Sequence, residues 1–213
     1  ARTLQAAGVS WRDVVEAGVY VTDIAAAAGV EQLVREGKVL YVGSSNFGAL
    51  HIALAQFAAE KRHFLGLVSE QSLYNLNART VELEVIPACR HFGLGLIPWS
   101  PLSGGLLGGA LQKAAAGRRA NEQAQARIEK LRPQLEAYEA LAAELGASPA
   151  NLGLAWLLHN PVVTAPIIGA RNVEQLEVSL AAADVEMTTD WRQAISDLSY
   201  TPPPATDRSE ERR

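Results

Sequence analysis

Short runs of apolar residues alternate along this chain with longer segments in which apolar residues recur every three or four positions. The short runs are rich in Val, Ile and Leu, which is typical of strands buried in a parallel sheet. The longer segments are typical of helices with one apolar face. The pattern predicts strands over residues 39–43, 65–70, 94–98 and 162–168. Strands and helices that alternate in this way indicate βαβ units.

The ends of the predicted helices carry boundary signals. Gly37 and Lys38 end one helical segment, and Ser148 followed by Pro149 is a typical N-cap and first-turn pair. Helices are predicted over residues 24–35, 50–61, 81–92, 123–145, 148–159, 173–182 and 188–198. A Gly-rich, polar stretch covers residues 100–121, and the proline-rich, charged tail over residues 201–213 is predicted to be disordered.

Two closures of such a sheet compete, an open doubly wound sheet and a (β/α)8 barrel. The GxGxxG fingerprint of doubly wound dinucleotide-binding folds follows none of the predicted strands. Gly104 and Gly105 do not supply it, because the strand before them ends in Pro98–Pro101. The sequence therefore predicts an α/β fold, a partial (β/α)8 TIM barrel with about four βα units and parallel strands.

Composition narrows the classes of partner. The 213 residues are 48% hydrophobic and 20% charged with a net charge of −4, and the basic residues are scattered, so no nucleic-acid partner is expected. No stretch reaches the about 18 apolar residues of a membrane span and no signal peptide opens the chain, so we expect a cytoplasmic protein. Cys89 is predicted to be a small buried thiol, and the histidines lack metal-ligand spacing.

Polar and aromatic residues follow the first three predicted strands, where a barrel of this type carries its chemistry. Ser45, Asn46 and Gln71 are neutral hydroxyl and amide side chains, which complement a carboxamide with one acceptor and two donors. Trp99 offers a flat face on which a nicotinamide ring can stack. These residue types suit the nicotinamide end of a dinucleotide.

The next segments suit its phosphate groups. Small residues from Ser100 to Gly105 let backbone N–H groups approach a pyrophosphate. The Gly169–Asn172 turn opens a helix whose N-terminus favours anions, and Arg171 is suited to an adenosine 2′-phosphate. Each feature also has an ordinary interpretation as a helix cap, a surface side chain, a flexible connector or a solvated cation. Their succession at the ends of four strands favours a binding site.

That succession resembles the aldo-keto reductase superfamily, specifically the bacterial members akin to the potassium-channel β-subunit group and to sugar-nucleotide reductases. Residues 35–47, 70–75, 97–105 and 165–176 resemble the family's fifth to eighth strands with the segments that follow them, and residues 154–158 fit the helix before the last. The resemblance runs over residues 28–200. It implies a nicotinamide dinucleotide, NADPH, as cofactor and a small aldehyde or ketone as substrate.

The resemblance also implies roles for individual residues. At the nicotinamide end, Ser45, Asn46 and Gln71 would hold the carboxamide and Trp99 would stack on the ring. The pyrophosphate would lie against Ser100, Leu102 and Ser103. The adenosine-phosphate end would be bound by Gly169, Arg171 and Gln175. Ser179 stands where the family often has an asparagine against the adenine, and its shorter side chain is expected to weaken that contact.

The resemblance does not supply catalytic residues. In this family an Asp, a Tyr, a Lys and a His from the first four strands reduce the carbonyl, and the Tyr donates the proton. The motifs around these residues are missing from the 213 residues, and Tyr20, Asp23 and Lys38 lie before the first barrel strand or on its approach. We therefore predict no catalytic residue in this chain.

Residues 1–27 form an atypical helix–strand segment. Residues 1–8 are helical in pattern, and Asp13–Asp23 reads as a strand. About two dozen residues here resemble an internal piece of the Rid family of enamine/imine deaminases. The alternative is a diverged helix and strand.

Three interpretations of the whole chain follow from the sequence. The first is an NADPH-dependent oxidoreductase by descent, not expected to be active alone. The second is a non-catalytic nucleotide-binding or interaction module like the channel β-subunits. The third is an inactive truncated or fused gene fragment. Half a barrel leaves open sheet edges, so self-association is expected.

Overall fold

The structure is a computed structural model that describes residues 32–112, 122–170 and 172–203. The chain divides into two units, Ala1–Tyr41 and Val42–Arg213, which are described separately. The helix predicted over residues 1–8, the strand predicted over Asp13–Asp23 and most of the tail lie outside the described residues.

The described part of the first unit is the end of a helix. Residues 32–35 are helical, and Gly37 follows with a φ of 68°, a left-handed conformation that favours glycine. The Gly37 N–H donates to Val34 O at 3.0 Å and the Lys38 N–H donates to Leu33 O at 2.9 Å. These bonds satisfy carbonyls of the last turn, so the predicted helix end at Gly37 is confirmed.

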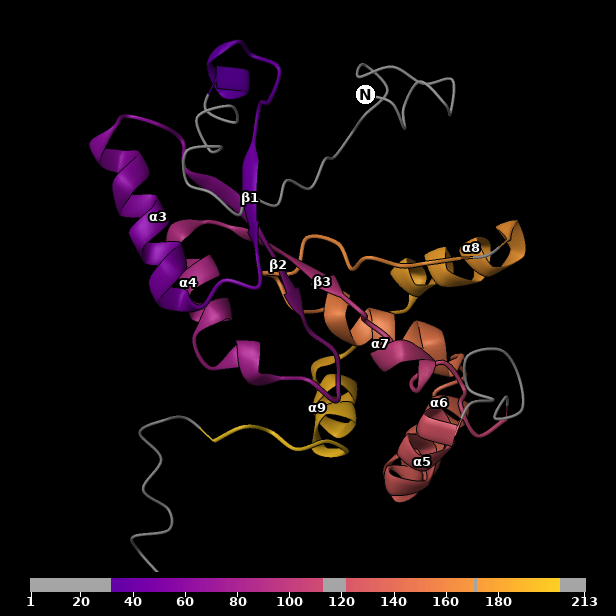
Figure 1. Cartoon of the computed structure of the whole chain (residues 1–213). Coiled ribbons are helices and arrows are strands. Elements are labelled where there is room, and N and C mark those ends of the chain that lie inside the picture. The colour runs from indigo at the N-terminus through magenta and orange to yellow at the C-terminus, as the bar shows by residue number, and fades with distance from the viewer. Residues whose placement is uncertain (1–31, 113–121, 171, 204–213) are drawn as a thin grey trace, which may run out of the picture. The chain divides into compact units, whose positions relative to one another are not determined.

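The second unit is built on three parallel strands in the order β1–β2–β3. The strands are β1 (Val42–Ser45), β2 (Leu67–Leu73) and β3 (Gly95–Trp99). Helix α3 (Ala49–Lys61) connects β1 to β2, and η3 (Thr80–Glu82) with α4 (Val85–Phe92) connects β2 to β3 (Figure 1). Parallel strands alternating with helices confirm the predicted α/β class and fit a partial (β/α)8 barrel.

The predicted fourth strand, residues 162–168, is reduced to one bridge between Val163 and Leu96. The Leu96 N–H donates to Val162 O and the Thr164 N–H donates to Leu96 O, both at 2.8 Å. The next ladder bonds would need N–H groups from Pro98 and residue 166, and both are prolines. The Ile167 N–H donates to Pro98 O instead, at 2.8 Å, so the pairing shifts by one residue.

The helical region after β3 differs from prediction at one point. The segment predicted as one helix is two, α5 (Glu122–Lys130) and α6 (Arg132–Glu144), and Pro133 in the first turn of α6 explains the break. Helix α7 (Pro149–Leu158) confirms the predicted cap, because the Ser148 side chain accepts from the Asn151 N–H. The remaining elements are η4 (Ser103–Gly105), α8 (Val173–Leu180), η6 (Ala181–Asp184) and α9 (Thr189–Asp197).

The two faces of the sheet differ in burial. On one face Glu70, Ser72, Leu96 and Pro98 are buried, and α3 and α4 lie along the sheet (Figure 1). On the other face Gln71, Ile97 and Trp99 are half-buried and Ser45 is exposed. Because side chains alternate along a strand, the predicted binding residues share the more open face.

The core lies between the strands and helices α4, α6, α7 and α9. Its centre is Trp156 of α7, whose ring centroid lies 5.3 Å from that of Tyr74. Burial raises the pKa of the Tyr74 hydroxyl, and the charge of Glu82 raises it further. Other large side chains with almost no exposed surface are Ile52, Leu76, Leu96, Leu107, Ile128, Leu135, Tyr138, Leu152, Leu154, Leu157 and Ile195.

Candidate dinucleotide-binding site

The structure brings together the residues predicted to hold a carboxamide. Ser45 is paired with Gln71 across β1 and β2, and Trp99 is paired with Leu73 across β2 and β3. Side chains two residues apart on a strand face the same way, so Ser45, Gln71 and Trp99 lie on one face at the carboxy ends of three neighbouring strands.

A series of hydrogen bonds connects this group, which we call the amide cluster (Ser45, Asn46, Gln71 and Trp99). The Ser45 hydroxyl donates to Gln71 O at 3.1 Å, and Asn46 Nδ2 donates to Ser45 Oγ at 3.1 Å. Trp99 Nε1 donates to Asn46 Oδ1 at 2.9 Å. The indole N–H therefore sets the orientation of the Asn46 amide, whose NH2 group carries a second hydrogen.

Asn46 holds its side chain in place through an unusual backbone conformation. Its φ is 58°, in the left-handed region, where asparagine is one of the residue types found most often after glycine. The Asn46 N–H donates to Gln71 O at 2.9 Å, so the turn after β1 is tied to β2.

The loop after β3 is also bent into left-handed conformations. Ser100 and Ser103 have φ values of 52° and 53°, and Gly104 and Gly105 follow with 68° and 96°. The Gly104 N–H donates to Ser100 Oγ at 3.2 Å, and the Ser103 and Gly105 N–H groups donate to carbonyls of the same loop. We expected these N–H groups to face a pyrophosphate; in the structure they hold the loop together.

The side chains at this loop differ in burial and in their partners. The Ser103 side chain is buried and its hydroxyl accepts from Asn77 Nδ2 at 3.3 Å, while Ser100 is half-buried. Leu102 turns into the core, since its Cδ2 lies 3.2 Å from where a Cβ on Gly153 would be. Arg127 Nη1 of α5 lies 3.9 Å from where a Cβ on Gly104 would be, so a cation borders the loop.

The residues predicted for the adenosine end form a separate group. The bond from the Ile167 N–H to Pro98 O places the segment before Gly169 beside the end of β3. Asn172 caps α8 by accepting from the Gln175 N–H at 3.0 Å, and the Ser179 hydroxyl donates to Gln175 O at 2.9 Å, one turn apart on the helix. Arg171 lies outside the described residues.

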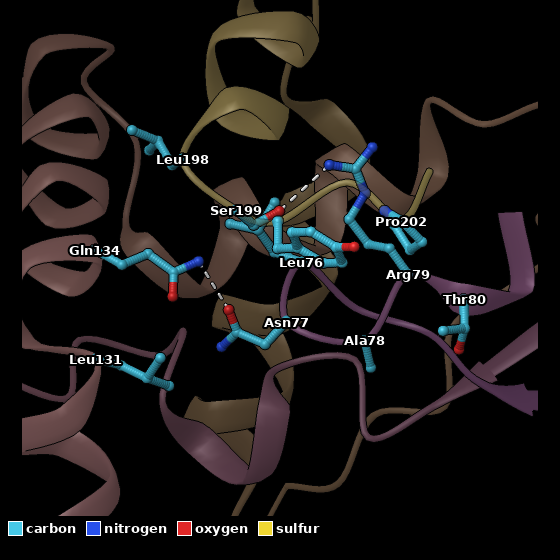
Figure 2. A pocket seen from close by; sticks show the side chains of 11 residues that line it. Leu76, Asn77, Ala78, Arg79, Thr80, Leu131, Gln134, Leu198, Ser199 and Pro202 are labelled. Atoms are coloured by element: carbon cyan, nitrogen blue, oxygen red, sulfur yellow. Dashed lines mark hydrogen bonds between the residues drawn. The ribbon is translucent and has the colours of Figure 1, made fainter. Parts of the chain in front are cut away.

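A cavity of about 350 Å³ lies beside Asn77, whose side chain contacts Ser103 in the loop after β3 (Figure 2). Gln134 Nε2 donates to Asn77 Oδ1 at 2.9 Å on one side, and Arg79 Nη1 donates to Ser199 Oγ at 3.3 Å on the other. Asn77 therefore belongs both to the cavity wall and, through its contact with Ser103, to the candidate site.

Sequence reasoning missed the side chains that hold these loops. Glu70, Asn75 and Asn77 are polar residues beside the site, and Asn75 is buried, with its Nδ2 donating to Ser100 O at 2.9 Å. A signal for Glu70 was available, because a charged residue at an inward-facing strand position next to Gln71 needs a specific partner. Nothing in the pattern singles out Arg127.

The chemistry of the donor set fits a nicotinamide dinucleotide. The amide cluster offers neutral donors and acceptors beside an indole face, and the next loop offers hydroxyls near one guanidinium. Over the described ranges, no group of His, Cys, Asp and Glu side chains is arranged to hold a metal ion, and no helix has the length and hydrophobicity to cross a bilayer.

Comparison with known proteins identifies the family. The model of the aldo/keto reductase family matches residues 13–199. The chain belongs to this family. The match begins inside the segment that also resembles Rid proteins, and that second resemblance remains a prediction.

Individual relatives agree with this assignment. The aldo/keto reductase chain is 51% identical over 168 residues to the "uncharacterized oxidoreductase YrpG" of Bacillus subtilis, covering 79% of this chain and 51% of the relative. It is 32% identical over 182 residues to an aldo-keto reductase of Fusarium vanettenii, and the match covers 83% of this chain and 48% of that relative. It is 31% identical over 176 residues to a "probable voltage-gated potassium channel subunit beta" of Arabidopsis thaliana, covering 75% and 54%. The chain spans about half the length of these relatives.

Proposed function

We propose that this chain binds NADPH and belongs to a cytoplasmic oxidoreductase that reduces small aldehyde or ketone carbonyls. The observation that carries the proposal is the amide cluster, in which hydrogen bonds join the Ser45, Asn46 and Trp99 side chains to one another and to the backbone carbonyl of Gln71, at the ends of three parallel strands. Family membership supports a nicotinamide cofactor.

The roles of the individual residues are those that the family resemblance implies. Ser45, Asn46 and Gln71 hold the carboxamide, and the Trp99 face supports the ring. The remaining contacts are assigned to Ser100, Leu102 and Ser103 at the pyrophosphate and to Gly169, Arg171, Gln175 and Ser179 at the adenosine-phosphate end. When bound, NADPH would supply a hydride, and the chain's own contribution is to fix which face of the ring is presented.

Binding is tested by calorimetric titration of the parent protein, Arg171→Ala and Trp99→Leu with NADPH and with NADH. We expect Arg171→Ala to lose about tenfold in NADPH affinity with little change for NADH, because a charge-assisted contact to the 2′-phosphate is lost. Trp99→Leu should weaken both dinucleotides. Arg132→Ala, an exposed arginine on α6, is the control. Absence of NADPH binding by the parent protein refutes the proposal.

Turnover is a separate question. The motifs of the Asp, Tyr, Lys and His that reduce the carbonyl in this family are missing from the 213 residues, so we propose that this polypeptide binds NADPH without reducing an aldehyde. The measurement is NADPH oxidation in the presence of a simple aldehyde. A rate near that of an ordinary enzyme, on the order of 10 per second, would reveal a proton donor among these residues.

A second candidate function is a non-catalytic nucleotide-binding or interaction module. It is favoured by the similarity to a relative named as a potassium channel subunit beta. In a polypeptide that also carries the family's Asp, Tyr, Lys and His, NADPH binding without turnover would support this role, and turnover would support the reductase.

A further inference from the structure

Glu70 is a buried carboxylate in β2, next to the predicted carboxamide-binding residue Gln71. Its residue surface is 0% exposed, and it lies on the covered face of the sheet. Within the part of the chain that the structure describes, no lysine, arginine or histidine forms an ion pair with it. Burying a carboxylate is unfavourable unless donors satisfy it, so its hydrogen bonds indicate what it holds.

Three donors converge on the Glu70 carboxylate. Oε1 accepts from the Phe47 N–H at 3.0 Å and from the Ser72 hydroxyl at 2.6 Å, and Oε2 accepts from the Ser44 hydroxyl. Ser44 and Phe47 lie immediately before and after Ser45–Asn46. The carboxylate therefore holds both ends of the turn that carries two members of the amide cluster.

The two peptide groups beside Asn46 are both fixed to β2. The N–H of Asn46 donates to Gln71 O at 2.9 Å, and the following N–H, that of Phe47, donates to Glu70. Between them Asn46 has its left-handed φ of 58°. Without the second bond, the backbone is free to leave this strained conformation, and the Asn46 side chain would then leave Trp99 and Ser45.

We propose that Glu70 is a positioning residue that holds the Ser44–Phe47 turn so that Ser45 and Asn46 can present a hydroxyl and an amide to the nicotinamide carboxamide. This inference rests on the proposed NADPH binding and adds a residue that need not touch the ligand. A carboxylate with only a structural role would affect all ligands equally. A positioning role affects only ligands that carry the nicotinamide.

The test compares binding of NADPH and of 2′,5′-ADP, which lacks the nicotinamide, by calorimetry. Glu70→Met keeps the length of the side chain but removes the acceptor, and we expect it to weaken NADPH by about tenfold and 2′,5′-ADP by less than about twofold. Glu70→Gln keeps one acceptor for the Phe47 N–H and should restore NADPH binding to within about threefold of the parent. Arg132→Ala, a change at an exposed arginine of α6 that makes no contact with Glu70, should bind both ligands like the parent.

The outcomes separate this inference from the function on which it rests. If the parent binds neither ligand, the proposed function fails and the inference fails with it. If the parent binds both and Glu70→Met binds NADPH normally, or loses both ligands equally, only the positioning role is overturned. If Glu70→Met does not fold, amide hydrogen exchange of Phe47 in the parent decides: protection is expected, and exchange at the rate of an open loop overturns the inference.

Discussion

Backbone strain is concentrated at the candidate site. Asn46, Ser100 and Ser103 have left-handed φ values of 58°, 52° and 53°, a conformation that costs a non-glycine residue roughly 1–2 kcal/mol. Buried polar side chains stabilise each turn, Glu70 at the first and Asn75 at the second. Conformations of this kind persist only where surrounding contacts determine them, as they do at binding sites.

Cys89 gives a prediction at the same scale. The thiol is fully buried; burial and, to a smaller extent, the charge of Glu70 together raise its pKa from a usual value of 9.0 to about 11. The unfolded chain therefore loses this proton at a lower pH than the folded protein. The stability that Cys89 contributes is complete below pH 9 and is lost as the pH rises through about 11.

Between about pH 8.5 and 11, the free energy of unfolding should fall in both proteins, but it should fall by about 2 kcal/mol less in Cys89→Ala than in the parent, because the variant has no thiol to titrate. Urea unfolding at several pH values measures it. Tyr74 and Tyr138 also have raised pKa values but titrate in both proteins, so they cancel in the comparison. Parallel curves for the two proteins would contradict the prediction.

At the scale of elements, Arg79 connects the segment after β2 to residues 196–201. Its guanidinium donates to both oxygens of Glu82 at 2.9 Å, to Ser196 O at 3.0 Å and to Thr201 Oγ1 at 2.8 Å. It also lies 5.6 Å from the centroid of the Trp156 ring. Thr201, the first residue of the predicted disordered tail, is therefore held against the core.

We predict that Arg79→Met destabilises the protein by about 3 kcal/mol, because Glu82 and the Ser196 carbonyl lose a donor in a buried setting. Thermal and urea unfolding measure the change. Arg132→Met is the matched control: its pair with Glu129 has the same three-residue separation along the chain but is exposed, so no measurable loss is expected. Equal effects in the two variants would mean that the Arg79 network contributes nothing beyond a surface pair.

Prediction of elements from the sequence worked best where the signal is local. The Ser148 cap, the Gly37 helix end and the order of strands and helices were all found from adjacent residues. The fourth strand was predicted over residues 162–168 but is reduced to one bridge, because the prolines at 98 and 166 interrupt the ladder once their segments lie side by side. The break at Leu131 was missed because apolar periodicity continues across it.

At the scale of the whole described unit, large apolar side chains remain exposed on α3. Leu50, Leu54 and Phe57 follow a helical spacing and are 67%, 56% and 51% exposed. Phe64 and Leu65 extend the same surface toward α4. An apolar stripe of this kind on the outer face of a helix favours association.

We therefore predict that the protein self-associates, as the sequence also suggested. Light scattering should show species larger than a monomer, and the double variant Leu54→Lys/Phe57→Lys should shift the distribution toward the monomer. Glu84→Lys, a change of charge outside the stripe, should leave it unchanged. A monodisperse monomer for the parent protein would contradict the prediction.

The sequence by itself determined the α/β class, the order of the elements and the residues that gather at the strand ends. These follow from local periodicity and from the rule that parallel strands end at the same edge. Only the tertiary structure showed that Trp99 orients Asn46, that Glu70 and Asn75 hold the two turns, and that the N–H groups after Ser100 bond within their own loop. The contacts of Trp99, Glu70 and Asn75 join segments 23 to 53 residues apart, whose partners no local pattern specifies.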